Sequence, residues 1–341
     1  MNLKKSLLLA LVFGIAALGA WEFYWRGQGY GPGLEDNKAL WAVQRSRANY
    51  ATENDVILLG DSRMLFDIQL DAFEKETGVR PIQLASAGTT PLPAFHDIVE
   101  NTDFKGTVLI SVHPIIFFFS TEETDFLWRR IKARIDHYQD RTYAQRLNHI
   151  LDIPLQYTFT FLRADDEDWT DDLDLKTLLS NVRVGTRALS PYPPFYRFQD
   201  IALDRNVTMF DKVVQDTAFA NSIIRAWTFE GPEPMPAPDK EGTMAFFLAD
   251  LDKFRERGGK VVLIRFPSSG GLLGFEKEMF SRENFYEVIV EKAGVPSYHF
   301  EDYEALNQFY CPEWSHLSAA DASTFTTELA RILKKDKVIN N

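Results

Sequence analysis

The feature that most constrains the fold of this chain is the stretch 56–63, an apolar run that stops at Gly60 and continues as Asp61, Ser62 and Arg63. Such a run before a turn is typical of a buried parallel strand. In an open α/β sheet, ligands bind at the carboxyl ends of the strands. The helical pattern that follows would point free backbone N–H groups toward Ser62. We therefore predict Ser62 as a nucleophile, with Asp61 and Arg63 as accessory groups; an ordinary Gly-Asp-Ser turn is the alternative.

A second polar stretch, near the end of the chain, offers the groups that a serine nucleophile needs. Glu313 and His316 lie three residues apart, just before the last helical pattern. A catalytic serine requires a base, and the base requires an acid that orients it. Because one turn of the chain can hold both side chains together, we predict a catalytic triad of Ser62, His316 and Glu313.

Together the two stretches resemble the SGNH (GDSL-type) hydrolase superfamily. The first block of that family is a Gly-Asp-Ser at a strand end, and its last block is an Asp-x-x-His before the C-terminal helix; Glu313 stands where the family usually has Asp. The resemblance covers about 55–113 and 258–335. It implies an oxyanion hole made by the backbone N–H groups of Ser62 and Gly88, the glycine that follows the second predicted strand. An ordinary tight turn is the alternative role of Gly88.

The third predicted strand departs from the family pattern. It ends in His113-Pro114, where the family commonly has a Gly-x-Asn-Asp whose Asn is a third oxyanion donor. Loss of one donor typically costs a factor of about a hundred in rate. The side chain of His113 or Arg63 could replace it, and a histidine at the core edge is the alternative for His113. Similar departures occur in membrane-anchored SGNH-like proteins of cell-surface polysaccharide export, such as the alginate O-acetylation and DltD-like proteins, which this sequence resembles in character.

Residues 1–25 are predicted to be an N-terminal signal anchor. Lys4 and Lys5 precede an uncharged apolar stretch at 7–21, and aromatic residues follow at 21–25. The length fits a signal-peptide core and is short for a spanning helix, whereas the aromatic residues are typical of a membrane interface. We favour an uncleaved anchor with the domain on the periplasmic or extracytoplasmic side; cleavage and secretion are the alternative. The glycine-rich segment 26–37 is predicted to be a flexible tether.

Strand and helix patterns alternate along the rest of the chain. Strands are predicted at 55–59, 82–85, 107–112, 261–264 and 297–300, and helices near 37–49, 68–77, 241–257, 276–292 and after Ser318. This alternation predicts an α/β fold for 38–341, a three-layer αβα sandwich with a central five-stranded parallel sheet. A largely helical insertion at about 115–241 interrupts it.

Composition limits the partners. The net charge of −12 argues against nucleic acid. The single cysteine, Cys311, excludes an intramolecular disulfide and a cysteine-based metal site, and it is either a second nucleophile or a buried packing residue. The acidic run at 165–172 lacks the glycine and final glutamate of an EF-hand loop. We predict no metal and no cofactor.

These observations predict a membrane-anchored, extracytoplasmic serine acyl esterase or O-acyltransferase, acting on acetyl or other acyl esters of an exported polysaccharide or envelope polymer. Because acetyl-CoA is cytoplasmic, a transferase would need a partner to pass the acyl group across, and the resemblance implies a membrane-bound O-acyltransferase. One alternative is a catalytically silent domain that binds glycan or scaffolds a secretion complex. Another is a lipid esterase, for which the apolar residues at 117–119 would help to form a substrate surface.

Overall fold

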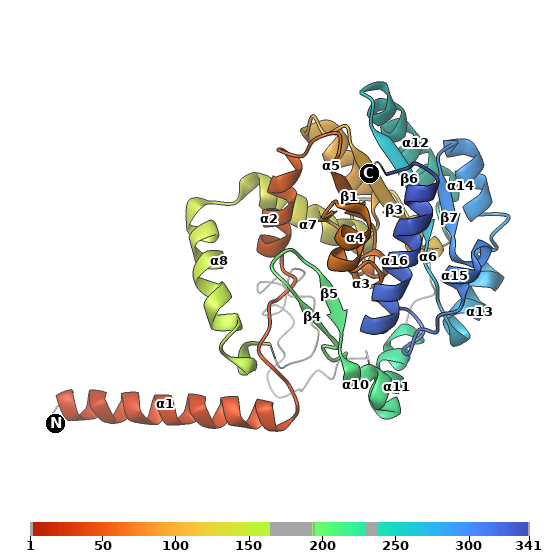
Figure 1. The fold of residues 1–341 in the computed structure, drawn as a ribbon. Helices are drawn as coiled ribbons and strands as arrows, with labels where there is room; N and C mark the ends of the chain where they lie inside the picture. The colour runs from red at the N-terminus through yellow and green to blue at the C-terminus, as the bar shows by residue number, and fades with distance from the viewer. Residues whose placement is uncertain (1–2, 164–192, 194, 230–236, 340–341) are drawn as a thin grey trace.

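The central element of the fold is a five-stranded parallel sheet. The computed structural model describes residues 3–163, 193, 195–229 and 237–339 (Figure 1). In these residues the sheet has the order β2-β1-β3-β6-β7. The α/β class and the five parallel strands are therefore confirmed. The order changes direction between β1 and β3, and such a switch point is where open α/β sheets bind ligands. The strands are β1 (Val56–Leu59), β2 (Ile82–Gln83), β3 (Thr107–Ser111), β6 (Lys260–Arg265) and β7 (Ser297–His299).

Helices cover both faces of the sheet, an arrangement compatible with a three-layer sandwich. Alternate residues of β1 enter two separate hydrophobic clusters, Val56 and Leu58 on one face and Ile57 and Leu59 on the other. The first cluster takes in α3 (Ser62–Asp67), α4 (Leu70–Thr77) and α16 (Ala319–Lys335). The second takes in α2 (Lys38–Ala48), α5 (Leu92–Asn101), α12 (Lys240–Glu256) and α14 (Tyr286–Ala293).

Two predicted helices differ from the observed ones. The helix predicted at 68–77 is preceded by α3, which begins at Ser62 itself. The helix predicted at 276–292 is two helices, α13 (Gly270–Met279) and α14. The break between them lets Phe280 turn into the core, where its ring contacts Phe285 at a centroid distance of 5.1 Å. After β7, a 3-10 turn η3 (Phe300–Asp302) and α15 (Glu304–Asn307) lead to the loop before α16.

The insertion at 115–241 is largely helical where the structure describes it, and it also contains a β-hairpin that we did not predict. The acidic run at 165–172 lies outside the described residues. Phe117 and Phe118 are fully buried in the second core cluster, so they do not form a surface for a lipid substrate. The elements are α6 (Pro114–Phe117), α7 (Phe126–Asp140), α8 (Tyr143–Gln156), η1 (Thr160–Leu162), β4 (Gln199–Ile201), β5 (Val207–Met209), α10 (Asp211–Gln215) and α11 (Thr217–Trp227).

The N-terminal helix α1 (Leu3–Gly27) extends away from the domain (Figure 1). It has 25 residues, none of them buried, and an 18-residue stretch within it has a mean hydropathy of 1.9. By length and composition it can be a signal anchor or a membrane span. The segment predicted as a flexible tether is bound to the domain in its second half, where Gly33 donates its N–H to Gln156 O (3.1 Å) and Asp36 pairs with Arg205 (2.8 Å).

Candidate functional site

Ser62 is the first residue of α3 and lies at the carboxyl end of β1. The neighbouring side chains leave room only for glycine at residue 60, because a Cβ there would lie 2.6 Å from the Cβ of Ser111 and 2.8 Å from that of Met64. As the first helical residue, Ser62 has a backbone N–H without an acceptor inside the helix. The structure thus places Ser62 at the sheet edge where we predicted it.

The predicted second oxyanion donor lies on the neighbouring turn. The N–H of Ser86, just after β2, donates to Gly60 O at 2.9 Å, which holds the turn 86–89 beside the turn 60–62. Gly88 has a φ of +61°, a conformation that favours glycine. Its N–H has no backbone acceptor within the described ranges. Two N–H donors are therefore available on adjacent turns.

The predicted acid and base form a buried pair. Nδ1 of His316 lies 2.9 Å from Oε1 of Glu313, and both residues are almost completely buried. The Glu313 carboxylate also accepts the N–H groups of His316 (2.6 Å) and Ser315 (3.3 Å). The glutamate side chain, which is longer than an aspartate, therefore folds back onto its own turn. Since a carboxylate only accepts, Nδ1 carries the proton in the neutral ring, and Nε2 keeps its lone pair.

The base packs against the helix that carries the nucleophile. The His316 ring stacks on Phe66, with 4.4 Å between centroids. Phe66 is one helical turn after Ser62, so the two side chains share a face of α3. Nε2 of His316 is buried without a hydrogen-bond partner among the residues described. The structure therefore brings His316 to the helix of Ser62 but makes no hydrogen bond between them.

The insertion supplies two further aromatic residues that we did not predict. Trp227, the last residue of α11, donates its Nε1–H to Oε2 of Glu313 at 2.5 Å. The ring of Phe198 lies 6.0 Å from that of His316. Both residues lie outside the segments that resemble the SGNH superfamily, so only the three-dimensional structure assigns them to the site.

Asp61 and His113, predicted as accessory residues, form a buried hydrogen-bonded pair. Asp61 accepts from His113 Nδ1 and from the Ser111 hydroxyl (3.0 Å), so its side chain does not cap α3. Burial raises the pKa of Asp61, but His113, Arg63 and Ser111 together lower it to about 2. Nε2 of His113 lies 3.2 Å from a Glu276 oxygen. Because both ring nitrogens face carboxylates, His113 is better described as a histidine at the core edge than as an oxyanion donor.

Arg63, the third predicted accessory residue, is fully buried in an ion-pair cluster around Glu276. Its Nη2 donates to Oε1 of Glu276 at 2.5 Å, while Arg265 and Ser268 donate to Oε2. Burial raises the pKa of Glu276, but Arg63 and Arg265 hold it well below its usual range. We did not predict Glu276; the one signal in the sequence is Arg265, a charged residue at the end of a buried strand.

The segment between β6 and the first turn of α13 lies against the stretch that carries Glu313 and His316. Ser269 donates its N–H to Trp314 O at 2.9 Å. Trp314 has a φ of +77°, unusual for a bulky residue, and a Cβ at Gly270 would lie 2.4 Å from its ring. Cys311 is fully buried, and burial raises the pKa of its thiol well above the usual range. It is a packing residue and not a second nucleophile.

Asp67, at the end of α3, should make stability depend on pH. Its Oδ1 accepts the N–H of Leu317, next to His316, at 2.9 Å, while Oδ2 is buried without a partner. Burial raises the pKa of Asp67 well above its usual range. A carboxyl group whose pKa is raised in the folded state stabilises the protein below about pH 4, the pKa of the group in the unfolded chain. This stabilisation is lost as the pH rises through the pKa of the folded state. Asp67→Asn keeps the Oδ1 acceptor and cannot ionise.

We therefore expect the unfolding free energy of Asp67→Asn, relative to wild type, to increase between pH 5 and pH 8 in urea titrations. The exposed Asp252 provides the matched control, because Asp252→Asn should show no such trend. A difference between Asp67→Asn and wild type that stays constant with pH would contradict the assignment.

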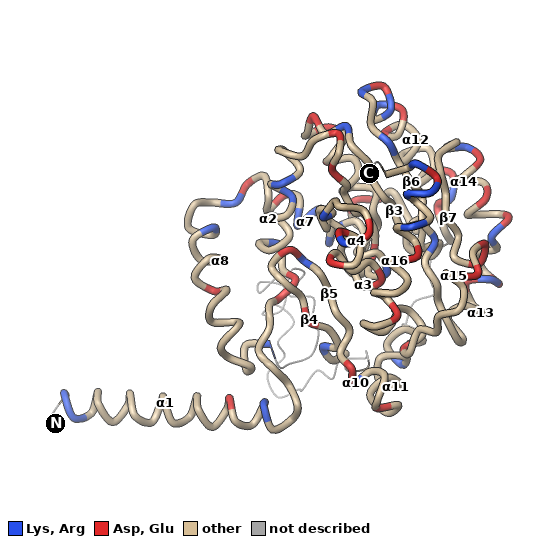
Figure 2. The backbone as a smooth tube through the Cα atoms, in the orientation of Figure 1, with Lys and Arg blue, Asp and Glu red and all other residues tan. Residues whose placement is uncertain are grey.

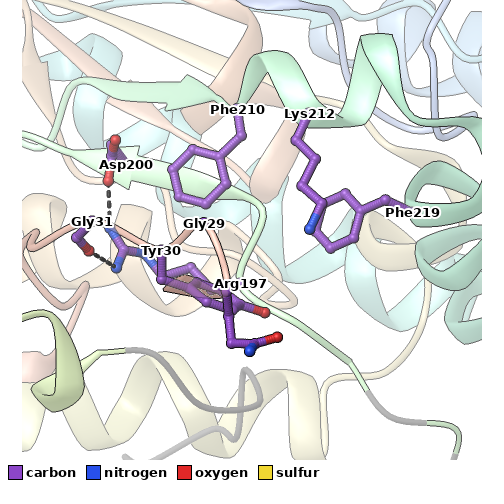
Figure 3. Close-up of a pocket in the computed structure, with 9 residues that line it drawn as sticks. Gly29, Tyr30, Gly31, Arg197, Asp200, Phe210, Lys212 and Phe219 are labelled. Atoms are coloured by element: carbon purple, nitrogen blue, oxygen red, sulfur yellow. Dashed lines mark hydrogen bonds and ion pairs between the residues drawn. The ribbon is translucent and has the colours of Figure 1, made fainter. Parts of the chain in front are cut away.

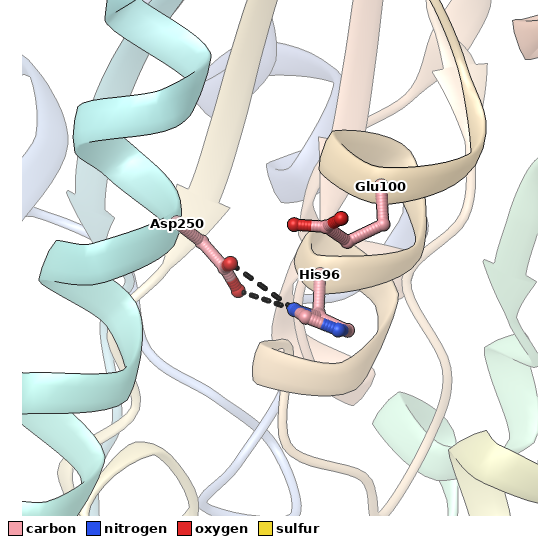
Figure 4. A group of neighbouring side chains, drawn as sticks. All are labelled: His96, Glu100 and Asp250. Atoms are coloured by element: carbon pink, nitrogen blue, oxygen red, sulfur yellow. Dashed lines mark hydrogen bonds and ion pairs between the residues drawn. The ribbon is translucent and has the colours of Figure 1, made fainter.

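Two other places in the described residues gather polar or charged groups. Figure 4 shows His96, Glu100 and Asp250, whose ligand atoms all lie within 4.8 Å of one another. The Lys253 ammonium lies 2.6 Å from Glu100 and 4.0 Å from Asp250, where a metal ion would bind. The lysine ammonium therefore already offsets part of the negative charge of the two carboxylates, and we assign no metal to the cluster.

The second is a hollow of about 290 Å³ between the segment after α1 and the β4–β5 hairpin (Figure 3). It contains none of the predicted site residues. Arg197 is paired with Asp200 and donates to Gly31 O, and the Lys212 ammonium lies 4.6 Å from the centre of the Phe219 ring. Its charges are thus satisfied within the protein, and we assign it no substrate.

The chain matches no protein-family model, and no curated protein shows significant similarity to it. The likeness to the SGNH superfamily therefore depends on the two short sequence blocks and on a compatible strand order.

Proposed function

We propose that this protein is a serine acyl esterase or O-acyltransferase in which Ser62 is the nucleophile. The observation that carries the proposal is the buried Glu313–His316 pair, whose Nε2 has no partner and which packs on the helix that Ser62 begins. A base needs a lone pair that is available and an acid that fixes its tautomer. Rotation of the Ser62 side chain on substrate binding would complete the triad.

The proposed mechanism uses only the groups described. His316 Nε2 takes the proton of the Ser62 hydroxyl while Oγ attacks the acyl carbonyl carbon. The N–H groups of Ser62 and Gly88 then stabilise the oxyanion. The protonated base returns its proton to the leaving alcohol, which gives an acyl-enzyme. Water or a sugar hydroxyl then attacks the acyl-enzyme, and this choice separates hydrolysis from transfer.

The substrate class follows from the anchor and from the resemblance. If α1 spans a membrane with its basic end in the cytoplasm, the domain meets the exported polysaccharides or envelope polymers of the cell surface. We propose acetyl or other acyl esters of such a polymer as substrate. Because acetyl-CoA is cytoplasmic, the transfer direction requires a membrane-bound O-acyltransferase as partner.

The test is turnover of the full chain in detergent, with p-nitrophenyl acetate and then with O-acetylated polysaccharide. We expect acetate release by wild type and a loss of at least about a thousandfold in His316→Ala. His137→Ala, a half-buried histidine on α7, should retain full activity. Equal rates for wild type and His316→Ala would contradict the proposal, as would turnover of phospholipid esters only, which fits a lipid esterase. Saturable polysaccharide binding without turnover fits the silent scaffold.

A further inference from the structure

Helix α8 presents its apolar face to the outside. Its exposed large apolar residues have the spacing of a single helical face. The opposite side of the helix carries Gln156, which is buried, and His149, Asp152 and Ile153, which are half-buried; of these, Ile153 packs against the first core cluster. A surface helix of a soluble domain has the reverse arrangement. The outward residues are Tyr143 (86% exposed), Leu147 (48%), Ile150 (62%), Leu151 (59%) and Leu155 (49%).

The C-terminal end of α8 leads directly to the place where α1 is attached. The carboxylate of Glu22, in α1, accepts the N–H groups of Thr160 (3.0 Å) and Phe161 (3.1 Å). The guanidinium of Arg26 donates to Thr158 O at 3.1 Å. These bonds connect the last two turns of α1 with the segment that follows α8, so the two helices are held in a defined relation.

The attachment point coincides with the aromatic group of α1. Trp21 and Tyr24 stack at 5.6 Å, and Trp25 contacts both. Tryptophan and tyrosine concentrate at the level of the lipid headgroups. The apolar stripe of α8 thus begins a few residues from the part of α1 that is expected at the membrane surface.

The arrangement in space fits a helix that lies on a membrane. In Figure 1, α8 is at the outer edge of the domain, on the side toward which α1 extends, and its axis runs across that of α1. Figure 2 shows charged residues of α1 only near its two ends, and few along α8. If α1 crosses a bilayer, a helix that runs across it near its C-terminal end can lie along the bilayer surface.

We propose that the apolar face of α8 inserts into the headgroup region of the leaflet that faces the domain, as a second membrane contact beside α1. This inference depends on the anchor in the proposed function, although not on the catalytic chemistry. Amphipathic helices bind bilayers in this way, with the apolar face at the boundary of the acyl chains. A second contact would fix the orientation of the domain on the membrane. With α1 as the single contact, α1 and the domain could tilt together relative to the bilayer.

The single, fully buried cysteine makes a direct test possible, since a new surface cysteine can be labelled selectively. The full chain is reconstituted in vesicles, and an environment-sensitive fluorophore is attached to Leu151→Cys on the apolar face, to Asn148→Cys on the flank of α8, or to Leu11→Cys in α1. Fluorescence is quenched either from within the acyl chains, by brominated lipids, or from water, by iodide.

We expect brominated lipids to quench the labels at 11 and 151 and iodide to quench the label at 148, with iodide quenching at 151 at least about fivefold weaker than at 148. Quenching at 11 but not at 151 by brominated lipids overturns the inference and leaves the anchor intact. A label at 151 that neither quencher reaches also overturns the inference and indicates that protein, and not lipid, covers the apolar face of α8. Quenching at neither 11 nor 151 overturns the anchor and the inference together.

Discussion

Ser62→Ala is expected to lower ester turnover by at least about a thousandfold while the unfolding free energy stays within about 1 kcal/mol of wild type. The large loss follows because the hydroxyl is the group that would form the acyl-enzyme. The small structural effect follows because Ser62 is half-buried at a helix start, where its side chain fills no core position. The measurement is steady-state turnover of an activated acetate ester, with circular dichroism to confirm the fold.

Ser323→Ala is the matched control for this substitution. Ser323 is exposed on α16, the helix that follows the His316 loop, so its loss should change neither rate nor stability. Turnover by Ser62→Ala at the rate of wild type would show that the Gly-Asp-Ser stretch is only a turn. Turnover lost equally in Ser323→Ala would show that the assay reports folding and not chemistry.

Glu276→Ala is expected to give the largest loss of stability, about 3–5 kcal/mol, because removing one partner of a buried ion pair leaves the other charge uncompensated. Here two guanidinium groups, those of Arg63 and Arg265, would lose their common carboxylate. Glu276 is also the acceptor for the Ser268 hydroxyl (2.7 Å). The measurement is the urea unfolding free energy at pH 7.

Two further variants make the test of the ion-pair cluster specific. Glu276→Gln keeps the shape of the side chain and should lose less stability than Glu276→Ala, which guards against a variant that simply fails to fold. Glu278→Gln, two residues along the same helix and exposed, should be within about 0.5 kcal/mol of wild type. If Glu276→Ala is as stable as Glu278→Gln, the ion-pair cluster around Glu276 does not stabilise the fold.

The sequence allowed the sheet and the acid–base contact to be predicted because both depend on local pattern. Apolar runs that end in turn residues identify buried parallel strands, and the three-residue spacing of Glu313 and His316 allows one turn to hold both. The helix boundaries were less accurate. The chain enters a helix at Ser62 immediately. A glycine pair, which is typical of a loop, begins α13, and the Trp314 ring leaves no room for a side chain at Gly270.

The rest of the site could not be predicted, because it depends on contacts between segments distant in the chain. Trp227 reaches Glu313 across 86 positions, and Glu276 reaches Arg63 across 213. Neither pair leaves a periodic signal in the sequence. His113 illustrates the same point: its position at a strand end suggested a replacement for the missing Asn, whereas the carboxylates on both sides of its ring become visible only in the folded chain.

The most direct test of Ser62 as the nucleophile is covalent labelling by a fluorophosphonate, which forms a stable bond with an activated serine. The labelled full chain is analysed by intact mass and by peptide mapping. We expect a single adduct on Ser62, absent from Ser62→Ala and formed much more slowly in His316→Ala. No adduct on wild type, or an adduct that persists in Ser62→Ala, would contradict this expectation.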